Sequence, residues 1–533
     1  MTDFIALLYL LNLQSNPMTN RLSFLYLFIF LLCIYTLTAG GHYGGDGFWN
    51  YLTAQSIVRD GDLRITNETF TMSEMQRQYE AVRSSGRQHS KYGLGLPLVE
   101  IPFYTMGHTL SKILPKIPAD YLTMFTTSMT NVVICALCGL FFFLIIQSFE
   151  YAQQTTTWLT AAFSLCTMIF PYAGYGFSEP LVCLGLLITT FGLINFKRNP
   201  TATMVLLSGL GFSIAILTKL FAFILLPIMI LYLRRNKCSS QAVMVFLLPI
   251  VATSLLIAWH NLARYGNIFQ TGYHLDILSQ KGGYFIFTTT QLFTAFYGLL
   301  FSTGRSFILF MPLICLFPIS YYKFRSSHPN EARFFLSLIL IQFIFLLPLI
   351  DWHGGSCWGP RYLLPIIPFC IFPLGALAEI AWIRRLSIVG LLMNLPGILM
   401  NPHLFVRFVQ DKKIGDIIFA PDHMGDLLFS PYLSPILGGY YQFTSAISRL
   451  LTGKSLHYTI SSSTERIQSA SLENYDLIDV WWLNALRTDM LNTTMTIGLL
   501  ILITCLLALA IYTARQFIQR NPKESHHEQT AHP

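Results

Sequence analysis

Charged residues are scarce in this chain of 533 residues. Asp, Glu, Lys and Arg make up 11% of the sequence, whereas hydrophobic residues make up 53%. Soluble domains carry about a quarter charged residues, so a water-soluble core does not account for this composition. The few charges lie in short clusters between long apolar runs. The composition therefore excludes ordinary soluble domains and predicts an all-α polytopic membrane protein.

Three patterns that would indicate another class of protein are also missing. Most of the ten cysteines lie within apolar runs and no Cys/His metal spacing appears, so neither a zinc site nor a disulfide framework is indicated. No small-residue cleavage site follows the apolar stretch 22–38, which predicts an uncleaved first span. The net charge of +8 does not indicate nucleic-acid binding, because most Lys and Arg residues stand at the ends of apolar runs.

About twelve apolar segments are candidates for membrane spans. If Arg21 marks the cytoplasmic side, alternation of the spans places the Lys/Arg clusters around residues 197, 235, 325, 385 and 520 on that side too. These clusters were not used to choose the spans, so their agreement supports cytoplasmic chain ends. The spans are predicted at residues 22–39, 122–147, 157–176, 180–196, 203–217, 220–233, 241–259, 304–322, 333–350, 361–382, 386–400 and 494–513.

The topology divides the chain into a catalytic module and smaller parts. Residues 1–400 form the membrane module with the outer loop 40–121, and residues 401–493 form an outer cap that contains Trp481 and Trp482. The last span, 494–513, precedes a disordered cytoplasmic tail at 514–533. Residues 94–110 are apolar but rich in Gly and Pro, which leaves open whether they span the membrane or lie at its interface.

Four groups of polar residues stand at the outer ends of the predicted spans. A charged side chain at the centre of a membrane helix costs about 2.5 to 3.5 kcal/mol, so each group needs a reason. The groups are the Gly-rich stretch 44–51 with Asp46, the junction 177–180 with Glu179, Lys219 between two short spans, and the Gly-rich, aromatic stretch 351–362 with Arg361. All four share one face of the membrane.

Each group also has an ordinary structural explanation. Asp46 fits a Gly-rich turn, and Glu179 fits the start of a helix. Lys219 fits a lysine that extends its amine to the membrane surface, Arg361 an interfacial anchor, and the tryptophans of 351–362 an aromatic belt. Together, however, two carboxylates, two cations and a lining of glycines and aromatic rings exceed what membrane anchoring requires.

Such a set of residues suits the transfer of a sugar from a lipid phosphate. A carboxylate takes the proton of an acceptor hydroxyl as that hydroxyl attacks an anomeric carbon of oxocarbenium character. Lys and Arg neutralise the departing phosphate. Because phosphate is an acidic leaving group, it needs no general acid.

Five motifs occur in order along residues 22–385. They are residues 45–55 (GDGFWNYLTAQ), 89–98 (HSKYGLGLPL), 178–180 (SEP), 217–219 (LTK) and 361–365 (RYLLP). Together they resemble the GT-C superfamily of polyprenyl-phosphate-dependent glycosyltransferases, in particular the branch of the protein O-mannosyltransferases and the aminoarabinose transferase of lipid A. The resemblance implies a GT-C-like bundle of about 12 transmembrane helices with juxtamembrane helices on its outer face.

The resemblance also implies roles for individual residues. Asp46 would be the catalytic base and Glu179 a second acid of the active site, and the donor phosphate would contact Lys91, Lys219 and Arg361. The family often has Asp-Glu where this chain has Asp46-Gly47, so no metal ligands are named, no cofactor is predicted, and a requirement for a divalent metal stays open. The residues expected to line the substrate site are Trp49, Tyr51, His89, Trp352, His353 and Tyr362.

The predicted function is that of an inverting glycosyltransferase. It would move a hexose or pentose from a polyprenyl-phosphate donor to a glycan, lipid or protein acceptor, at the periplasmic or outer face of the inner or plasma membrane. A flippase or transporter of lipid-linked sugars is the alternative, although its polar groups would lie near the midplane and its chain would show inverted repeats. A non-catalytic scaffold of the same fold also stays open. The residues name neither the sugar nor the acceptor.

Overall fold

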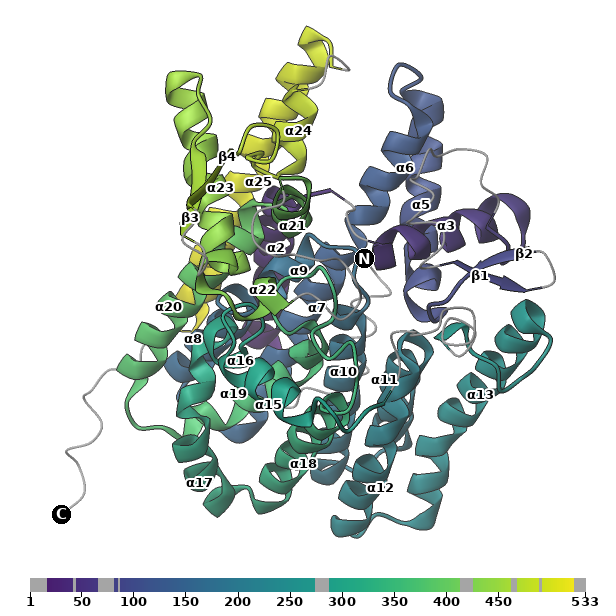
Figure 1. Ribbon diagram of the computed structural model, residues 1–533. Coiled ribbons are helices and arrows are strands. Elements are labelled where there is room, and N and C mark those ends of the chain that lie inside the picture. Colours follow the sequence, from purple (N-terminus) through teal and green to yellow (C-terminus); the bar gives the residue numbers. More distant parts are fainter. Residues whose placement is uncertain are drawn as a thin grey trace.

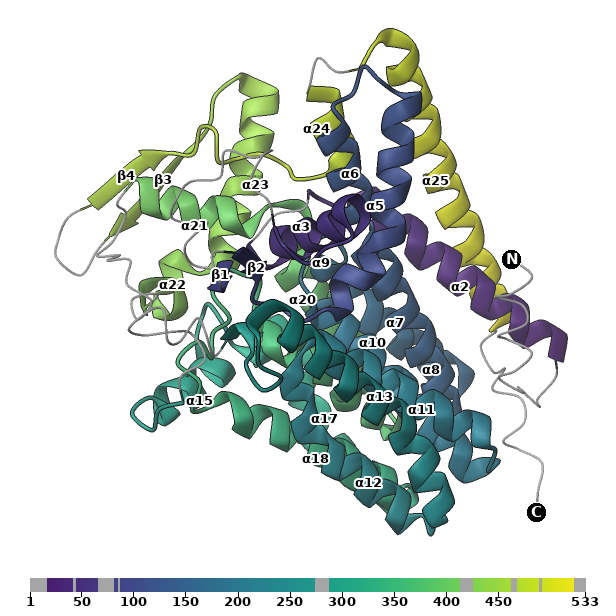
Figure 2. The same cartoon turned by 90° about the vertical axis from the view of Figure 1, so that its right-hand side faces the viewer.

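The computed structural model describes residues 17–41, 45–65, 81–84, 87–273, 287–412, 425–461, 467–487 and 491–521. Most of these residues are helical, as predicted (Figures 1 and 2). The described strands form two antiparallel hairpins, in which Ala81 pairs with Ser90 and His457 with Ser471. The strands are β1 (Ala81–Ser84), β2 (Arg87–Ser90), β3 (His457–Ser461) and β4 (Ile467–Ser471).

A helical bundle forms the body of the molecule. Helix α10 packs on both α7 and α11, and α11 packs on α13. The α10–α11 contact is close, since a Cβ on Gly185 would lie 2.7 Å from the carbonyl oxygen of Gly211. Small residues allow such approach in membrane bundles, where van der Waals packing holds helices together. The helices of this part are α2 (Pro17–Thr38), α7 (Thr130–Ile146), α8 (Gln153–Leu165), α9 (Ile169–Ala173), α10 (Glu179–Arg198), α11 (Ala202–Thr218), α12 (Leu226–Arg235), α13 (Ser240–Tyr265), α15 (Leu292–Phe301), α16 (Phe307–Phe310), α17 (Phe317–Ser327), α18 (Pro329–Leu346), α19 (Ile367–Ile371), α20 (Ile380–Leu399) and α25 (Thr493–Arg520).

Within the described residues, six helices are long and apolar enough to cross a membrane. They cover Ala119–Phe149, Glu179–Arg198, Ser240–Tyr265, Pro329–Leu346, Ile380–Leu399 and Thr493–Arg520, and four shorter apolar helices cover Leu22–Thr38, Ala202–Thr218, Leu292–Phe301 and Arg361–Ala376. The predicted number of about twelve spans is therefore not confirmed.

Several predicted spans are interrupted, and proline explains most of the breaks. Proline lacks the backbone N–H that an α-helix needs and clashes with the preceding turn. The predicted span 304–322 divides at Pro312, and 361–382 changes between 3-10 and α-helix around Pro365, Pro368 and Pro373. The 3-10 helices are η1 (Gln147–Phe149), η2 (Leu220–Leu225), η3 (Pro312–Leu316), η4 (Arg361–Ile366), η5 (Phe372–Ala376) and η6 (Pro431–Leu433). The last helix runs to Arg520, past the predicted end of its span at 513, and residues 522–533 of the predicted tail lie outside the described residues.

The loop predicted at 40–121 contains ordered helices. These are α3 (Gly45–Asp60), α5 (Gly95–Ile113) and the start of α6 (Ala119–Ser128), and α5 packs on both α3 and α6. Residues 94–110, whose position was left open, thus belong to one helix. In both ribbon views α5 and α6 rise side by side beyond the bundle (Figures 1 and 2).

The segment predicted as the cap, residues 401–493, packs a small core of its own and is bonded to α2. Its core includes Phe405, Phe408 and Tyr458. The indole Nε1 of Trp481 donates to the carbonyl oxygen of Thr36 (2.7 Å), and that of Trp482 donates to Leu37 (2.9 Å). These bonds satisfy carbonyls that the C-terminal end of α2 leaves without helical partners. The helices of the cap are α21 (Pro402–Asp411), α22 (Gly425–Phe429), α23 (Pro435–Thr452) and α24 (Trp481–Arg487).

The basic clusters gather at one end of the bundle. Lys197 and Arg198 end α10, and they pair with Glu331 at the start of α18 (2.7 Å) and with Glu150 (3.7 Å). Helices α12 and α17 extend to this end, at the bottom of Figure 1. Glu179 begins α10, and a helix of 20 residues is about 30 Å long. The predicted acidic and basic site residues therefore lie a membrane's thickness away from the basic clusters.

Candidate active site

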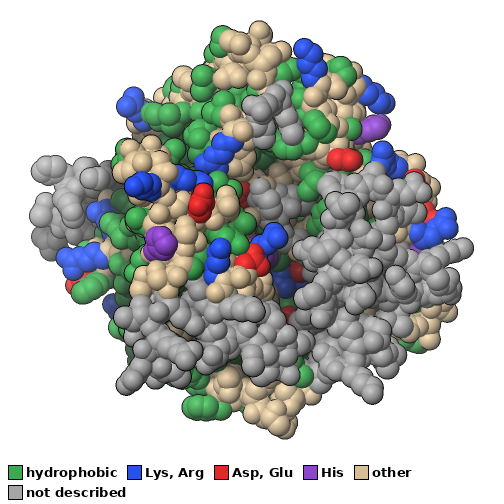
Figure 3. Space-filling model, turned by 45° about the horizontal axis from the view of Figure 1, so that its top comes forward, with side chains coloured by type: hydrophobic (Ala, Val, Ile, Leu, Met, Phe, Trp, Pro, Cys, Tyr) green, Lys and Arg blue, Asp and Glu red, His purple; other side chains and the backbone are tan. Residues whose placement is uncertain are grey.

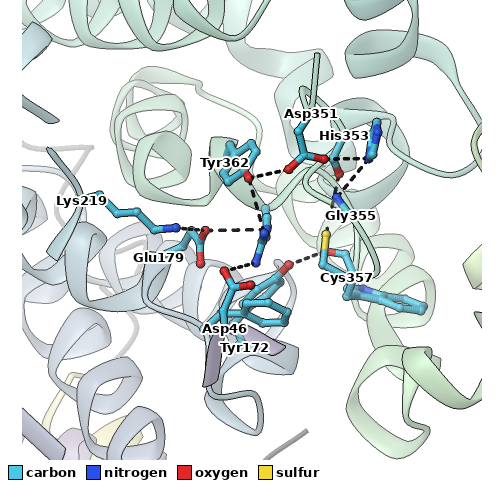
Figure 4. Close-up of polar contacts among 12 residues, drawn as sticks. Asp46, Tyr172, Glu179, Lys219, Asp351, His353, Gly355, Cys357 and Tyr362 are labelled. Atoms are coloured by element: carbon cyan, nitrogen blue, oxygen red, sulfur yellow. Dashed lines mark hydrogen bonds and ion pairs between the residues drawn. The ribbon is translucent and has the colours of Figure 1, made fainter. Parts of the chain in front are cut away.

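Four of the predicted site residues meet at the ends of four different elements. Asp46 lies in the first turn of α3, Glu179 begins α10, Lys219 follows α11, and Arg361 begins η4. A helix end can direct a side chain away from its own helix, so residues far apart in sequence can converge there. Figure 4 shows Asp46, Glu179 and Lys219 close together. The guanidinium of Arg361 contacts the carboxylates of both Asp46 and Glu179.

The four charges form a chain of alternating sign. The Nη1 of Arg361 lies 2.8 Å from Oδ2 of Asp46, and its Nε lies 3.8 Å from Oε1 of Glu179. The Nζ of Lys219 lies 3.2 Å from the same Oε1. Two cations thus face two carboxylates, and Arg361 contacts both carboxylates.

Burial strengthens these interactions. The exposed fraction is 0% for Glu179 and 8% for Asp46. Burial alone would raise the pKa of the Asp46 carboxyl, but the positive charges of Arg361 and Lys219, with a hydrogen bond from Tyr92, lower that pKa to about 2. Asp46 is therefore ionised at neutral pH and able to accept a proton only if its cationic neighbours are drawn away.

Local packing explains why the first motif reads Asp46-Gly47. A Cβ on Gly47 would lie 2.7 Å from the carbonyl oxygen of Gly176. This contact brings the start of α3 against the loop that precedes Glu179. The amide Nδ2 of Asn131 donates to the carbonyl of Phe177 (2.8 Å) and fixes the same loop. A second carboxylate at position 47 would not fit without moving the backbone, so the acidic pair of the family has no room here.

The motif 89–98 brings Lys91 and Tyr92 to the site. The hydroxyl of Tyr92 donates to Oδ1 of Asp46 (2.8 Å). Arg264, near the end of α13, holds this segment through the carbonyl oxygen of Ser90 (2.7 Å). Lys91 is buried, and its charge also lowers the pKa of Asp46. The structure therefore brings all three cations that are predicted to bind the donor phosphate near Asp46.

The loop 351–360 supports Arg361 from its other side. The Nη2 of Arg361 lies 3.4 Å from the hydroxyl of Tyr362, which donates to Oδ2 of Asp351 (3.1 Å). Gly354 has a φ of +74°, and a Cβ there would lie 2.9 Å from Cγ of Arg361, so the loop can cross Arg361 only with glycine at this position. Arg305 binds the backbone carbonyl of His353 (2.8 Å) and that of Gly355.

His353 is a neutral member of this loop. Its Nδ1 accepts the backbone N–H of Gly355 (3.0 Å) and therefore carries no proton. The distance of 3.4 Å between Nδ1 and Oδ1 of Asp351 is thus not an ion pair. Burial lowers the pKa of His353 and outweighs the opposing charge of Asp351, and Arg305 lowers it further.

The remaining predicted lining residues have packing contacts. Trp49 and Tyr51 are buried in a cluster between α3 and α5, and the hydroxyl of Tyr51 bonds Thr123 of α6 (2.9 Å). The Nδ1 of His89 lies 3.1 Å from the carbonyl oxygen of Leu63. Trp352 lies over α15, where a Cβ on Gly298 would be 2.0 Å from its ring. That Trp49, Tyr51, His89 and Trp352 line the substrate site therefore stays a prediction. Tyr362, by contrast, contacts Arg361 directly.

Sequence reasoning missed several residues that build the site. Tyr92 lies within a quoted motif and was detectable there. Arg264 and Arg305 lie in segments without a motif, and His403 belongs to the cap. Burial lowers the pKa of His403 to about 4, and the charge of Arg361 acts in the same direction. No group of three or more His, Cys, Asp or Glu within the described residues is arranged to hold a metal ion.

The site residues lie at the end of the bundle opposite Lys197 and Arg198, because Glu179 begins α10 and these two residues end it. Figure 3 views that end, and acidic and basic side chains surround a hollow near the middle of the face. Chemically, the cluster offers cations that can bind an anion and a carboxylate that can accept a proton once those cations engage the anion.

No family model and no curated protein matches the sequence. Among solved structures, the chain is similar to ArnT from Cupriavidus metallidurans bound to undecaprenyl phosphate, with a TM-score of 0.44 and 12% identity over 93% of this chain and 75% of that one. It is also similar to ArnT in the apo state, with a TM-score of 0.40 and 12% identity over 92% and 73%. ArnT is a GT-C glycosyltransferase, as is the family that the five motifs resemble.

Proposed function

We propose that the protein is an inverting glycosyltransferase of the GT-C type that uses a polyprenyl-phosphate sugar. The observation that carries this proposal is the position of Arg361 between Asp46 and Glu179, with Lys219 on the far side of Glu179. The positive charges of Arg361, Lys219 and Lys91 all act on the carboxylate of Asp46, and clusters of cations of this kind bind phosphate groups.

The donor phosphate binds where Lys219 and Arg361 converge. A phosphate is a stronger competitor for the guanidinium than one carboxylate, because it offers several charged oxygens to the planar fork of Arg361. When Arg361 turns toward the phosphate, its positive charge interacts less strongly with the carboxylate of Asp46. The pKa of Asp46 then rises, because that charge is the largest cause that lowers it in the free protein. Donor binding thereby makes Asp46 a better base at the moment when it is needed.

The transfer itself is a single displacement. The acceptor oxygen forms a bond to the anomeric carbon while the bond from that carbon to the phosphate oxygen breaks. The electron pair of the broken bond stays on the phosphate, where Arg361 and Lys219 neutralise it, and the acceptor proton passes to Asp46. The products are the glycosylated acceptor and the polyprenyl phosphate.

The positions of the two acids favour inversion. A retaining reaction needs a second carboxylate as a nucleophile close to the sugar. Glu179 has no exposed surface and lies between Lys219 and Arg361, which suits a residue that orients the cations. Asp46 keeps some exposed surface and is the better candidate for the base. Glu179 remains the fallback if Asp46 proves dispensable.

The site would face the periplasm or an equivalent outer compartment. The basic helix ends lie at the opposite end of the bundle, and Lys and Arg are enriched on the cytoplasmic side of membrane proteins. The donor's lipid chain would stay in the bilayer with its phosphate at the level of the helix ends. The cap, as the segment that covers this end, would help to select the acceptor.

The direct test incubates the purified protein with a panel of polyprenyl-phosphate sugars and follows the donors by mass spectrometry. Transfer, or slow hydrolysis with water as the acceptor, is expected for the matching sugar and should disappear in Asp46→Asn. Transport of an intact lipid-linked sugar across proteoliposomes without cleavage would instead support a flippase. Binding of polyprenyl phosphate without either activity would support a non-catalytic scaffold.

A further inference from the structure

The cap contributes one side chain to the edge of the charged cluster. His403 lies in the first turn of α21, where the side chain of Asn401 accepts its backbone N–H (2.9 Å) and begins the helix. The imidazole ring stacks on Phe177, with the ring centres 6.3 Å apart and the planes 26° apart. Phe177 stands two residues before Glu179, so His403 reaches the loop that positions the second acid.

The same phenyl ring also carries the guanidinium of Arg361. The Cζ of Arg361 lies 4.6 Å from the centre of the Phe177 ring. His403 is therefore one aromatic ring away from the cation that would bind the donor phosphate. In the donor, the phosphate is attached to the anomeric carbon, and the hydroxyl groups are attached to the other carbons of the same sugar ring. A hydroxyl group of the sugar and the phosphate are therefore separated by about the width of one ring, as His403 and Arg361 are.

The imidazole is electrically neutral and has an unused polar atom. Burial and the charges of Arg361 and Arg305 keep the pKa of His403 at about 4, in spite of Asp46. Its buried Nε2 has no hydrogen-bond partner within the described residues. A neutral imidazole has one N–H donor and one acceptor nitrogen, so it can bond a hydroxyl in either direction. It would not compete with Arg361 and Lys219 for the phosphate.

We propose that His403 hydrogen-bonds a hydroxyl group of the donor sugar and so helps to determine which sugar is accepted. This inference rests on the proposed glycosyltransferase function and adds a specificity-determining residue from the cap. A site with an unpaired buried polar atom discriminates against a ligand that lacks the matching hydroxyl, because the atom then stays unpaired. A deoxy sugar or a lipid phosphate without sugar would lose this contact.

The experiment measures binding without an acceptor, so that catalysis does not enter. Full-length protein in nanodiscs is titrated with undecaprenyl phosphate and with a panel of undecaprenyl-phosphate hexoses and pentoses. The variants are His403→Phe, which keeps the stacked ring and removes both nitrogens, and His403→Gln, which keeps a donor and an acceptor. His457→Phe serves as the matched control, because His457 is an exposed residue of the same cap.

We expect the wild type to bind one sugar lipid more tightly than undecaprenyl phosphate. His403→Phe should lose about tenfold of that preference, the range of one hydrogen bond, with unchanged affinity for undecaprenyl phosphate. His403→Gln should recover part of it, and His457→Phe should lose nothing. Unchanged affinity for the sugar-free lipid also shows that the variant is folded.

The outcomes separate this inference from the proposed function. If His403→Phe keeps the full preference for the sugar lipid, or if the wild type binds all the lipids equally, the role of His403 is refuted while the phosphate site stands. If the wild type binds neither lipid, the proposed function itself fails. Loss of preference only for the acceptor in a separate transfer assay, with donor binding intact, would reassign His403 to the acceptor and overturn the inference.

Discussion

Replacing Asp46 with asparagine tests the central assignment. Asparagine keeps the shape of the side chain and can still accept from Tyr92, whose hydroxyl lies 2.8 Å from Oδ1. It removes the negative charge that lies 2.8 Å from Nη1 of Arg361 and the ability to take up a proton. General-base catalysis contributes about a hundred- to ten-thousand-fold, so turnover should fall by that order.

The same change should tighten donor binding. The pKa of about 2 for Asp46, against an ordinary value of 3.8, means that its surroundings favour the ionised form by about 2 kcal/mol. Arg361 supplies the largest attractive part of that stabilisation and gives some of it up when it turns to the phosphate. Without the Asp46 charge that competition ends, and the affinity for undecaprenyl phosphate should rise severalfold, up to about tenfold. From the sequence alone we would expect donor affinity to stay nearly unchanged.

Single-turnover transfer and lipid titration on the same preparations measure both effects, with Glu179→Gln as the comparison. Near-normal transfer by Asp46→Asn together with an inactive Glu179→Gln would move the base to Glu179. Weaker binding of undecaprenyl phosphate by Asp46→Asn would show that Asp46 does not compete with the phosphate. Unchanged thermal unfolding of both variants is the required control.

Four further predictions follow from the same geometry. Lys219→Met and Arg361→Met should each raise the apparent donor KM or lower kcat by at least tenfold, and wild-type kinetics in both would remove the phosphate role. The pH profile of kcat/KM should show no loss of activity from protonation of Asp46 above about pH 4, because the pKa of Asp46 is about 2 in the free protein. The profile of kcat should show such a loss at a higher pH, because donor binding raises the pKa of Asp46. In a cysteine-free background, Lys454→Cys on the cap should react with an impermeant thiol reagent only from outside and Arg235→Cys only from the cytoplasm; the reverse pattern would invert the topology. Trp482→Phe should lower the free energy of unfolding by about 1 kcal/mol, measured by thermal or denaturant unfolding, because it removes one hydrogen bond to α2.

The charged cluster could be anticipated from the sequence because its members share a property that a sequence reveals. Asp46, Glu179, Lys219 and Arg361 each interrupt or end an apolar run, and the alternation of spans places such positions on one face of the membrane. The sequence does not show which of the two cations contacts which of the two carboxylates. That Arg361 lies between the two acids depends on the packing of α3, α10 and η4, which no local pattern specifies.

The differences between the expected and the observed elements also have physical causes. Span counting treats proline as one more apolar residue, yet Pro312 and Pro365 lie where the expected spans change to 3-10 helix. Aromatic residues near a motif are predicted to line the substrate site, and this stays a prediction for Tyr51, whose hydroxyl bonds Thr123 of α6. His403 stands in a segment with no motif, so only the tertiary fold shows that it reaches the site.

The bonds from α24 to the end of α2 give the chain an order of assembly. Trp481 and its acceptor Thr36 are 445 residues apart, so α2 cannot acquire this hydrogen bond until the chain has been synthesised beyond Trp481. Asp46 follows α2 closely in the sequence, and the bonds from α24 to the end of α2 form only after most of the described residues have been synthesised. A nascent or prematurely terminated chain therefore carries the residues of the site without the support that fixes them.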